Sequence, residues 1–179
     1  TYPVTTLVCT GYNSFDNSVD VKHYYSGSST TNGLAGAAGL TGYSDNELTL
    51  NYSTDNVDLG NFPKMYGTTT SDIVAETNVF GVYNGTFTGT YTTTVDAYGT
   101  MDGSTFEGPF LVTRLKTVEH LEINSPGVGI VGTFAQTTYR YYRAAELWPY
   151  VKSTNRVINI AAFNADSNVT QIEKAPEYF

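Results

Sequence analysis

The chain has 179 residues, a length that fits one domain with a buried core. Its net charge is −8 and its pI is near 4.5, which argues against contacts to nucleic acid or anionic lipid through phosphates. No apolar run approaches a membrane span, and the single cysteine, Cys9, excludes an intrachain disulfide.

The N-terminal part is expected to hold three strands and one long loop. Strands are predicted at residues 4–9, 19–25 and 47–52, where sheet-forming residues lie between turn-forming ones. Residues 1–10 form a short apolar arm, which is either the first strand of the domain's own sheet or a strand donated to a neighbour. Small residues without a clear period over 26–42 predict a long surface loop, with a binding loop or a strap against another subunit as the alternative.

The clearest pattern of the chain is the alternation over residues 86–97. Apolar side chains recur at Phe87, Tyr91 and Val95, while threonines fill the even positions between them. A period of two is typical of a strand with one buried face. Asp102-Gly103 predicts the hairpin turn that follows.

Turn signals divide the remaining strands. Strands are predicted over the ranges 79–83, 110–123, 129–135, 137–143, 157–163 and 169–172. Asn84-Gly85 fits a tight connection before the long strand, and Ser125-Pro126-Gly127 ends the strand 110–123. Pro63 makes residues 55–70 an edge strand or an ordered loop.

About ten strands at this spacing predict an all-β fold in one domain over residues 1–179. We expect an antiparallel β-sandwich of the jelly-roll or immunoglobulin-like kind, with a barrel as the alternative. Few charges, many Thr and Tyr residues, a single cysteine and a chain that begins at Thr1 favour a processed extracellular or cell-surface protein.

Catalytic motifs are not evident, and we predict that the chain is not an enzyme. His23 shares a strand face with apolar residues and is expected to be a packed histidine, whereas His120 and its neighbour Glu119 face opposite ways and cannot act together. No zinc-ligand spacing is present. Asp96 and Asp102 flank the hairpin and are interpreted as turn residues.

Calcium is the one cofactor for which the sequence offers candidates. Clustered oxygen ligands at alternating spacing suit a hard cation, although no EF-hand loop is present. The candidates are Asn13, Asp16, Asp20, Asn164 and Asp166.

Aromatic residues near the C-terminal strands are the main binding clue. They can pack in the core, form a subunit interface or stack on sugar rings. They are Tyr139, Tyr141, Tyr142, Trp148 and Tyr150. Sequons compatible with glycosylation begin at Asn51, Asn84 and Asn168.

Four blocks of the sequence carry a resemblance to a known family. They are Asn61-Phe62-Pro63-Lys64-Met65-Tyr66-Gly67, Val95-Asp96-Ala97-Tyr98-Gly99-Thr100-Met101, Leu111-Val112-Thr113-Arg114-Leu115-Lys116 and Tyr139-Arg140-Tyr141-Tyr142. In order and spacing they resemble a β-domain that recurs in secreted and surface proteins of Bacteroidota, often with type IX sorting tails. The chain departs from the family pattern at Ala97, where glycine is preferred, and at Met101. The resemblance implies an extracellular β-domain and no catalytic residue.

The leading functional hypothesis is an extracellular structural or surface protein. Its sharpest form is a filament or pilus subunit that assembles through β-strand addition, with copies of itself or other surface proteins as partners. The alternative is a carbohydrate-binding β-sandwich module that takes glycans. The second alternative is a secreted hydrolase or a barrel-type cyclase.

Overall fold

The structure is a computed structural model. It describes residues 7–12, 19–30, 33–45, 48–52, 57–62, 64–80, 83–103, 108–143, 149–160 and 165–174. Over these ranges the regular elements are all β-strands, and none of the described residues forms a helix that could span a membrane. The strands are β1 (Leu7–Tyr12), β2 (Val19–Thr30), β3 (Gly33–Asp45), β4 (Leu48–Asn51), β5 (Val57–Phe62), β6 (Thr69–Phe80), β7 (Tyr83–Asp102), β8 (Pro109–Ser125), β9 (Gly129–Arg143), β10 (Val151–Ile160) and β11 (Ala165–Lys174).

The strands form one antiparallel sheet with the order β1-β2-β3-β4-β6-β7-β8-β9-β10-β11, and β5 pairs with β3 beside this path. The all-β antiparallel prediction is therefore confirmed. Neighbours in the sheet are almost always neighbours in the chain, so the connectivity is a meander. The crossed connections of a jelly roll or an immunoglobulin fold are not part of this order.

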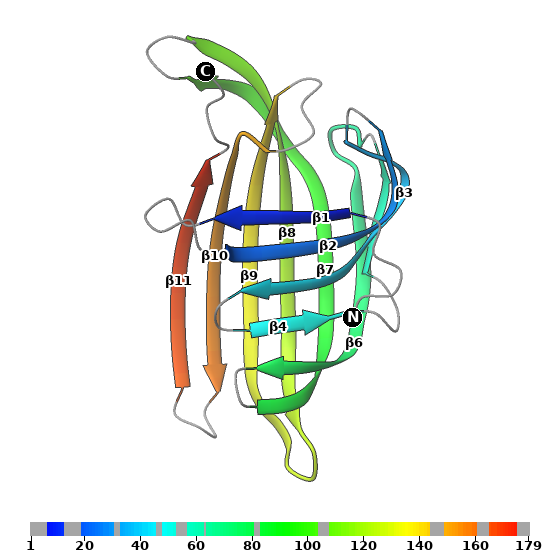
Figure 1. Cartoon of the computed structure of the whole chain (residues 1–179), viewed down its shortest axis with the longest axis vertical. Helices are drawn as coiled ribbons and strands as arrows, with labels where there is room; N and C mark the ends of the chain where they lie inside the picture. The colour runs from blue at the N-terminus through cyan, green and yellow to red at the C-terminus, as the bar shows by residue number, and fades with distance from the viewer. Residues whose placement is uncertain are drawn as a thin grey trace.

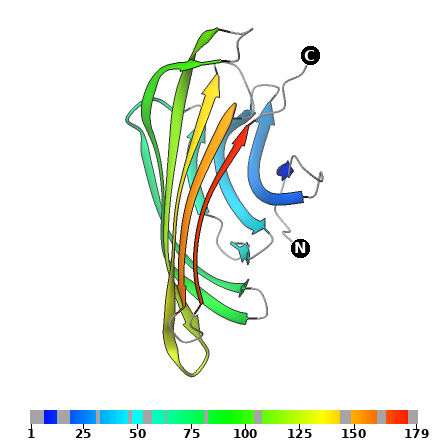
Figure 2. The same ribbon diagram turned by 90° about the vertical axis from the view of Figure 1, so that its left-hand side faces the viewer.

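The sheet folds over on itself into two layers. In Figure 1 β1, β2 and β4 run crosswise to the long strands β8 to β11, and β6 and β7 bend from one layer into the other. Figure 2 shows the curvature of the long strands from the side. Because β1 and β11 are the two ends of the strand order, the arrangement is an open sandwich rather than a closed barrel.

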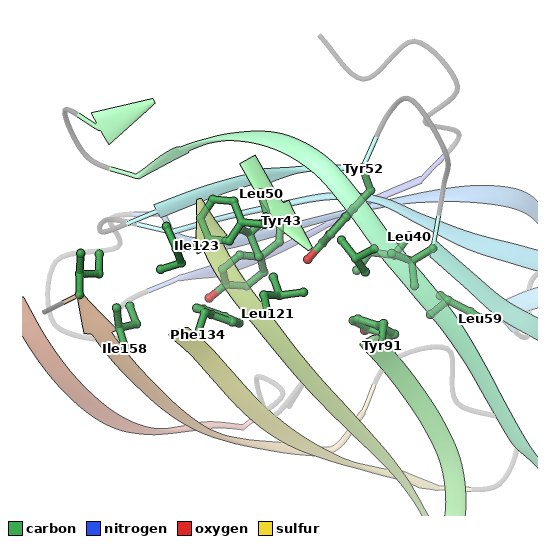
Figure 3. Packing of buried hydrophobic residues seen from close by; sticks show 14 of the residues in the cluster. Leu40, Tyr43, Leu50, Tyr52, Leu59, Tyr91, Leu121, Ile123, Phe134 and Ile158 are labelled. Carbon is green, nitrogen blue, oxygen red and sulfur yellow. The ribbon is translucent and has the colours of Figure 1, made fainter. Parts of the chain in front are cut away.

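The core lies between the N-terminal layer (β1 to β4) and the C-terminal layer (β7 to β11). Tyr43, Leu50 and Tyr52 reach from the first layer toward Leu121 and Phe134 of the second (Figure 3). All five side chains are buried. Burial of one such large apolar side chain stabilises the fold by roughly 1.5–3 kcal/mol. Together these contacts hold the two layers against each other.

The alternation predicted over residues 86–97 is confirmed. Phe87, Tyr91 and Val95 are buried, whereas Thr88 and Thr90 are exposed. The same period of two governs β8, β9 and β10, whose alternate residues are buried. Each long strand of the C-terminal layer therefore presents one face to the interior.

The loop predicted at residues 26–42 is wrong, because β2 extends to Thr30 and β3 begins at Gly33. The two strands pair with shifts in register, one of them after Gly27, whose φ is 123°. A Cβ at Gly27 would lie 2.8 Å from the carbonyl oxygen of Ala37. The small residues therefore permit a close, irregular strand pairing. Judged by composition alone, such a segment resembles a loop.

Two of the three predicted turns are confirmed. β7 and β8 are joined at Asp102-Gly103, where the Gly103 amide donates to the Gly108 carbonyl at 3.1 Å, and β8 ends at Ser125 before Gly127, whose φ is 78°. The Asn84-Gly85 turn is wrong, because both residues lie in β7 opposite β6. Phe80 and Tyr83 face each other there, so the chain reverses before Tyr83.

Strand ends also differ from the prediction. The ranges 129–135 and 137–143 are one strand, β9, and β10 begins at Val151 rather than at residue 157. The part of the N-terminal arm that the structure describes belongs to β1, which pairs with β2 of the same chain.

Candidate functional site

Residues that face each other across antiparallel strands share one face of the sheet, and on the inner face of the C-terminal layer they form rows. An apolar row consists of Leu121, Phe134 and Ile158. Next to it, a mixed row consists of Tyr91, Glu119, Gln136 and Arg156. A threonine row consists of Thr93, Thr117, Thr138 and Thr154, and a basic row of Leu115, Arg140 and Lys152.

These rows follow directly from the period of two in the sequence. On β10, Lys152, Thr154 and Arg156 precede the apolar Ile158 at every second position, and all four are buried. β9 shows the same change, from Arg140, Thr138 and Gln136 to Phe134. On β8, Thr117 and Glu119 are followed by Leu121 and preceded by Leu115. The interior is thus apolar at the Leu121 end of the long strands, and its buried polar residues gather beyond that end.

Glu119 is the buried carboxylate of the mixed row. Tyr52 follows β4 in the N-terminal layer, and its hydroxyl donates a hydrogen bond to Glu119 Oε1. Burial raises the pKa of Glu119 to about 7, although the Tyr52 hydrogen bond and the charge of Arg140 act in the opposite direction. Glu119 therefore changes charge near neutral pH.

Arg140 links the two layers from the basic row. Its Nη1 donates to Thr117 Oγ1 at 2.9 Å, and its Nη2 lies 3.5 Å from His23 Nε2. Burial, followed by the charges of Lys152 and Arg140, lowers the pKa of His23 well below its ordinary value. Because arginine only donates, a neutral His23 accepts through Nε2.

Aromatic rings of the N-terminal layer enclose this polar region. Tyr43 packs edge-on against His23 with ring centroids 5.0 Å apart, and its hydroxyl lies 3.5 Å from Arg156 Nη1. Each of Glu119, Arg140 and Arg156 therefore meets one side chain of the opposite layer. We call Glu119, Gln136, Arg140, Lys152 and Arg156 the interior polar cluster.

The interior polar cluster is predominantly basic. Among the described residues, the buried charged side chains are one carboxylate, Glu119, and three bases, Arg140, Lys152 and Arg156. The whole chain has only nine Lys and Arg residues and a net charge of −8, so a third of its bases lie inside an otherwise acidic molecule. Such a group of bases can hold an oxyanion.

Two buried polar atoms beside the bases lack a protein partner. Gln136 Oε1 in the mixed row and Thr93 Oγ1 in the threonine row are not hydrogen-bonded to any described residue. Buried polar groups are nearly always satisfied in folded proteins. Both atoms are therefore available as hydrogen-bond partners for a ligand in this part of the interior.

The five aromatic candidates do not form one surface. Tyr139 is half-buried under two bases, with the Arg114 guanidinium 4.9 Å and the Lys116 ammonium 5.9 Å from its ring centroid. Tyr150 is buried against Phe110 at 4.8 Å between ring centroids.

Tyr141 lies two residues after Tyr139 on the same face of β9, and its hydroxyl accepts a hydrogen bond from Arg114. Tyr142 belongs to the other face of the strand and faces Thr113 across β8 and β9. Trp148 lies outside the described residues.

The carboxylates near the hairpin have structural roles that differ from each other. Asp96 lies at a bulge inside β7, not in a turn as predicted, and its two oxygens accept from Arg114 at 2.9 and 3.0 Å. Asp102 ends β7 at the hairpin, as expected. His120 is exposed while Glu119 is buried, which confirms that they face opposite ways.

The calcium candidates are only partly within the described residues. Asn13, Asp16 and Asn164 lie outside them, and Asp20 and Asp166 belong to β2 and β11. In the described part of the chain, no three His, Cys, Asp or Glu side chains gather as a metal site would require.

The three sequons lie in strands. Asn168 is exposed on β11, Asn51 is half-buried on β4, and Asn84 belongs to β7. Asn168 is therefore more accessible for modification than Asn51.

Sequence reasoning missed Gln136, Lys152 and Arg156 altogether and assigned Arg140 only to a motif. The available signal was the alternation of Lys152, Thr154 and Arg156 with the apolar Ile158, which places bases and a core residue on one strand face.

Comparisons with protein-family models, curated proteins and solved structures gave no match.

Proposed function

We propose that this chain is an extracellular β-domain that binds a small organic oxyanion between its two layers. The observation that carries the proposal is the burial of three bases, Arg140, Lys152 and Arg156, on the inner face of β9 and β10. The resemblance to secreted Bacteroidota domains supports the extracellular location.

The neighbourhood of the bases favours an anion as the ligand. Three buried bases exceed one buried carboxylate among the described residues, so an anion placed among these bases meets a net positive charge. The threonine row supplies hydroxyl groups beside the bases. The partnerless oxygen of Gln136 and hydroxyl of Thr93 add further polar atoms at the same level.

The apolar row limits where the ligand can lie. Leu121, Phe134 and Ile158 form this row directly beside the mixed row that contains Arg156. These three side chains are buried in the core that Tyr43, Leu50 and Tyr52 complete from the opposite layer. We therefore place the oxyanion at the polar rows and not on the apolar row.

Calorimetric titration of the full chain with sulfate and with benzenesulfonate tests the proposal. Replacement of a base, in Arg156→Gln or Lys152→Gln, is expected to weaken binding about tenfold or more, because a hydrogen bond to a charged group contributes roughly 1.5–3 kcal/mol. Lys116→Gln is the matched control, since Lys116 lies over Tyr139 away from the interior rows. Equal weakening by Lys116→Gln, or no binding by the wild-type chain, would contradict the proposal.

Self-association is a second candidate function, favoured by the two open ends of the sheet. In the described strand order β1 pairs only with β2, and β11 pairs only with β10 along ten residues. If β11 of one copy joins β1 of the next, the contact is heterologous and repeats without closing, as in a filament. Sedimentation velocity at increasing protein concentration measures this association directly.

A further inference from the structure

We propose that Glu119 is an internal competitor for the ligand, so that the interior polar cluster binds an oxyanion more tightly when Glu119 is neutral. The inference rests on the proposed function and adds its regulation. An ionised Glu119 and a bound oxyanion are both attracted by the same bases. The charge of the ionised carboxylate therefore offsets part of the attraction between these bases and the oxyanion. Binding is therefore expected to strengthen as the pH falls.

Position in the sheet makes Glu119 the natural competitor. It faces Gln136 across β8 and β9, and Gln136 in turn faces Arg156 across β9 and β10. Thr117, two residues before Glu119 on the same strand, accepts the hydrogen bond from Arg140. Glu119 thus lies in the row of Arg156 and two rows from Arg140, whose guanidinium reaches the threonine row between them.

Every other element around Glu119 presents a neutral or a basic group. Tyr91 of β7 faces it in register, Tyr52 donates to it, and Tyr43 of β3 lies beside Tyr52. From β2, His23 approaches Arg140 and Lys152. In the described interior no second carboxylate is buried, so Glu119 alone there can exchange its charge for that of a ligand.

The direction of the pH effect follows from the protonation of these groups. The pKa of Glu119, raised by burial to about 7, puts its charge change within the accessible pH range. A bound oxyanion repels the ionised carboxylate and favours its protonation, so binding takes up protons from solution near pH 7. Protonation of His23 would also favour an anion, but its lowered pKa places that change at more acid pH.

Titrations with benzenesulfonate at about pH 5.5 and about pH 8.5, at constant ionic strength, provide the test. The charge of this anion is the same at both pH values. Wild-type affinity is expected to increase about fivefold or more from the higher to the lower pH, a typical coupling between two sites. Glu119→Gln is expected to bind tightly at both pH values. Titration in buffers of different ionisation enthalpy should show proton uptake by the wild type and none by Glu119→Gln.

Tyr52→Phe provides a second variant that leaves Glu119 in place. The hydrogen bond from Tyr52 lowers the pKa of Glu119. Its loss should therefore raise that pKa and move the pH midpoint of affinity upward. Circular dichroism establishes that both variants are folded. This variant distinguishes a titrating Glu119 from a general loss of charge.

The possible outcomes separate the two proposals. Wild-type binding without pH dependence, or pH dependence that persists in Glu119→Gln, overturns the role of Glu119 and leaves the proposed function intact. Absence of sulfate and benzenesulfonate binding at every pH overturns the proposed function together with the inference. pH-dependent binding by the wild type and flat, tight binding by Glu119→Gln support both.

Discussion

At the scale of single residues, the interior combines satisfied and unsatisfied hydroxyl groups in one row. Thr117 Oγ1 accepts a hydrogen bond from Arg140 at 2.9 Å, whereas Thr93 Oγ1, directly opposite in register, has no hydrogen-bond partner among the described residues. Two identical side chains on adjacent strands should therefore contribute differently to stability. The difference arises from Arg140 of β9, not from the threonines themselves.

Thr93→Val tests this difference. The change removes a buried hydroxyl that no described protein atom satisfies, so the free energy of unfolding is expected to rise by about 1 kcal/mol. Thr117→Val, the matched control, is expected to lower it by about 1.5 kcal/mol, because it leaves a donor of Arg140 unpaired. Denaturant unfolding measures both, and equal destabilisation by the two variants would show that the Thr93 hydroxyl has a partner such as ordered water.

At the scale of elements, the edge strand β11 determines whether the sheet can grow. Its exposed face carries Asn168, Thr170 and Ile172, and Ile172 is 72% exposed. An extended edge with an exposed β-branched residue is a template for another strand unless charge prevents it. β10, one strand inward, already has partners on both sides.

Ile172→Lys is expected to reduce self-association if edges join the copies. A lysine on the edge strand opposes strand addition, so the concentration-dependent rise in sedimentation coefficient should disappear. Val157→Lys is the control, since Val157 is 45% exposed and faces Asn168 from the non-edge strand β10. A monomeric wild-type chain, or equal effects of the two lysines, would contradict assembly through the edge.

At the scale of the whole molecule, Glu119 and His23 make the contact between the layers sensitive to pH in opposite directions. The pKa of Glu119 is raised from 4.5 to about 7, so its contribution to stability is present below pH 4.5 and is lost as the pH rises to about 7. The pKa of His23 is lowered below 6.5, so stability falls when the pH drops under that value. The two effects partly compensate each other between these limits.

Glu119→Gln isolates the acidic contribution. Relative to the wild type, its free energy of unfolding is expected to increase between pH 4.5 and about 7 by an amount on the order of 3 kcal/mol, because the variant never buries a charge there. Glu122→Gln changes an exposed carboxylate on the opposite face of β8 and should show no comparable trend. Thermal unfolding across this pH range, followed by circular dichroism, measures the difference, and parallel curves for wild type and Glu119→Gln would refute it.

The sequence by itself determined the fold class and the faces of the long strands. Alternation at Phe87, Tyr91 and Val95 is a local property of the chain, and a strand with this pattern can bury only one face. The turns at Asp102-Gly103 and Ser125-Pro126-Gly127 were also local signals. Composition failed over residues 26–42, because small residues serve a close strand pairing as well as a loop.

Only the tertiary structure decided what the polar residues of those faces do. Period two places Glu119, Arg140 and Arg156 each on an inner face, but strand register and the fold-over of the sheet bring them together. Their partners Tyr52, His23 and Tyr43 come from strands about 70 to 120 residues away in the chain, and their contacts cross between layers. Burial, charge and pKa all depend on these long-range contacts, which a local pattern does not contain.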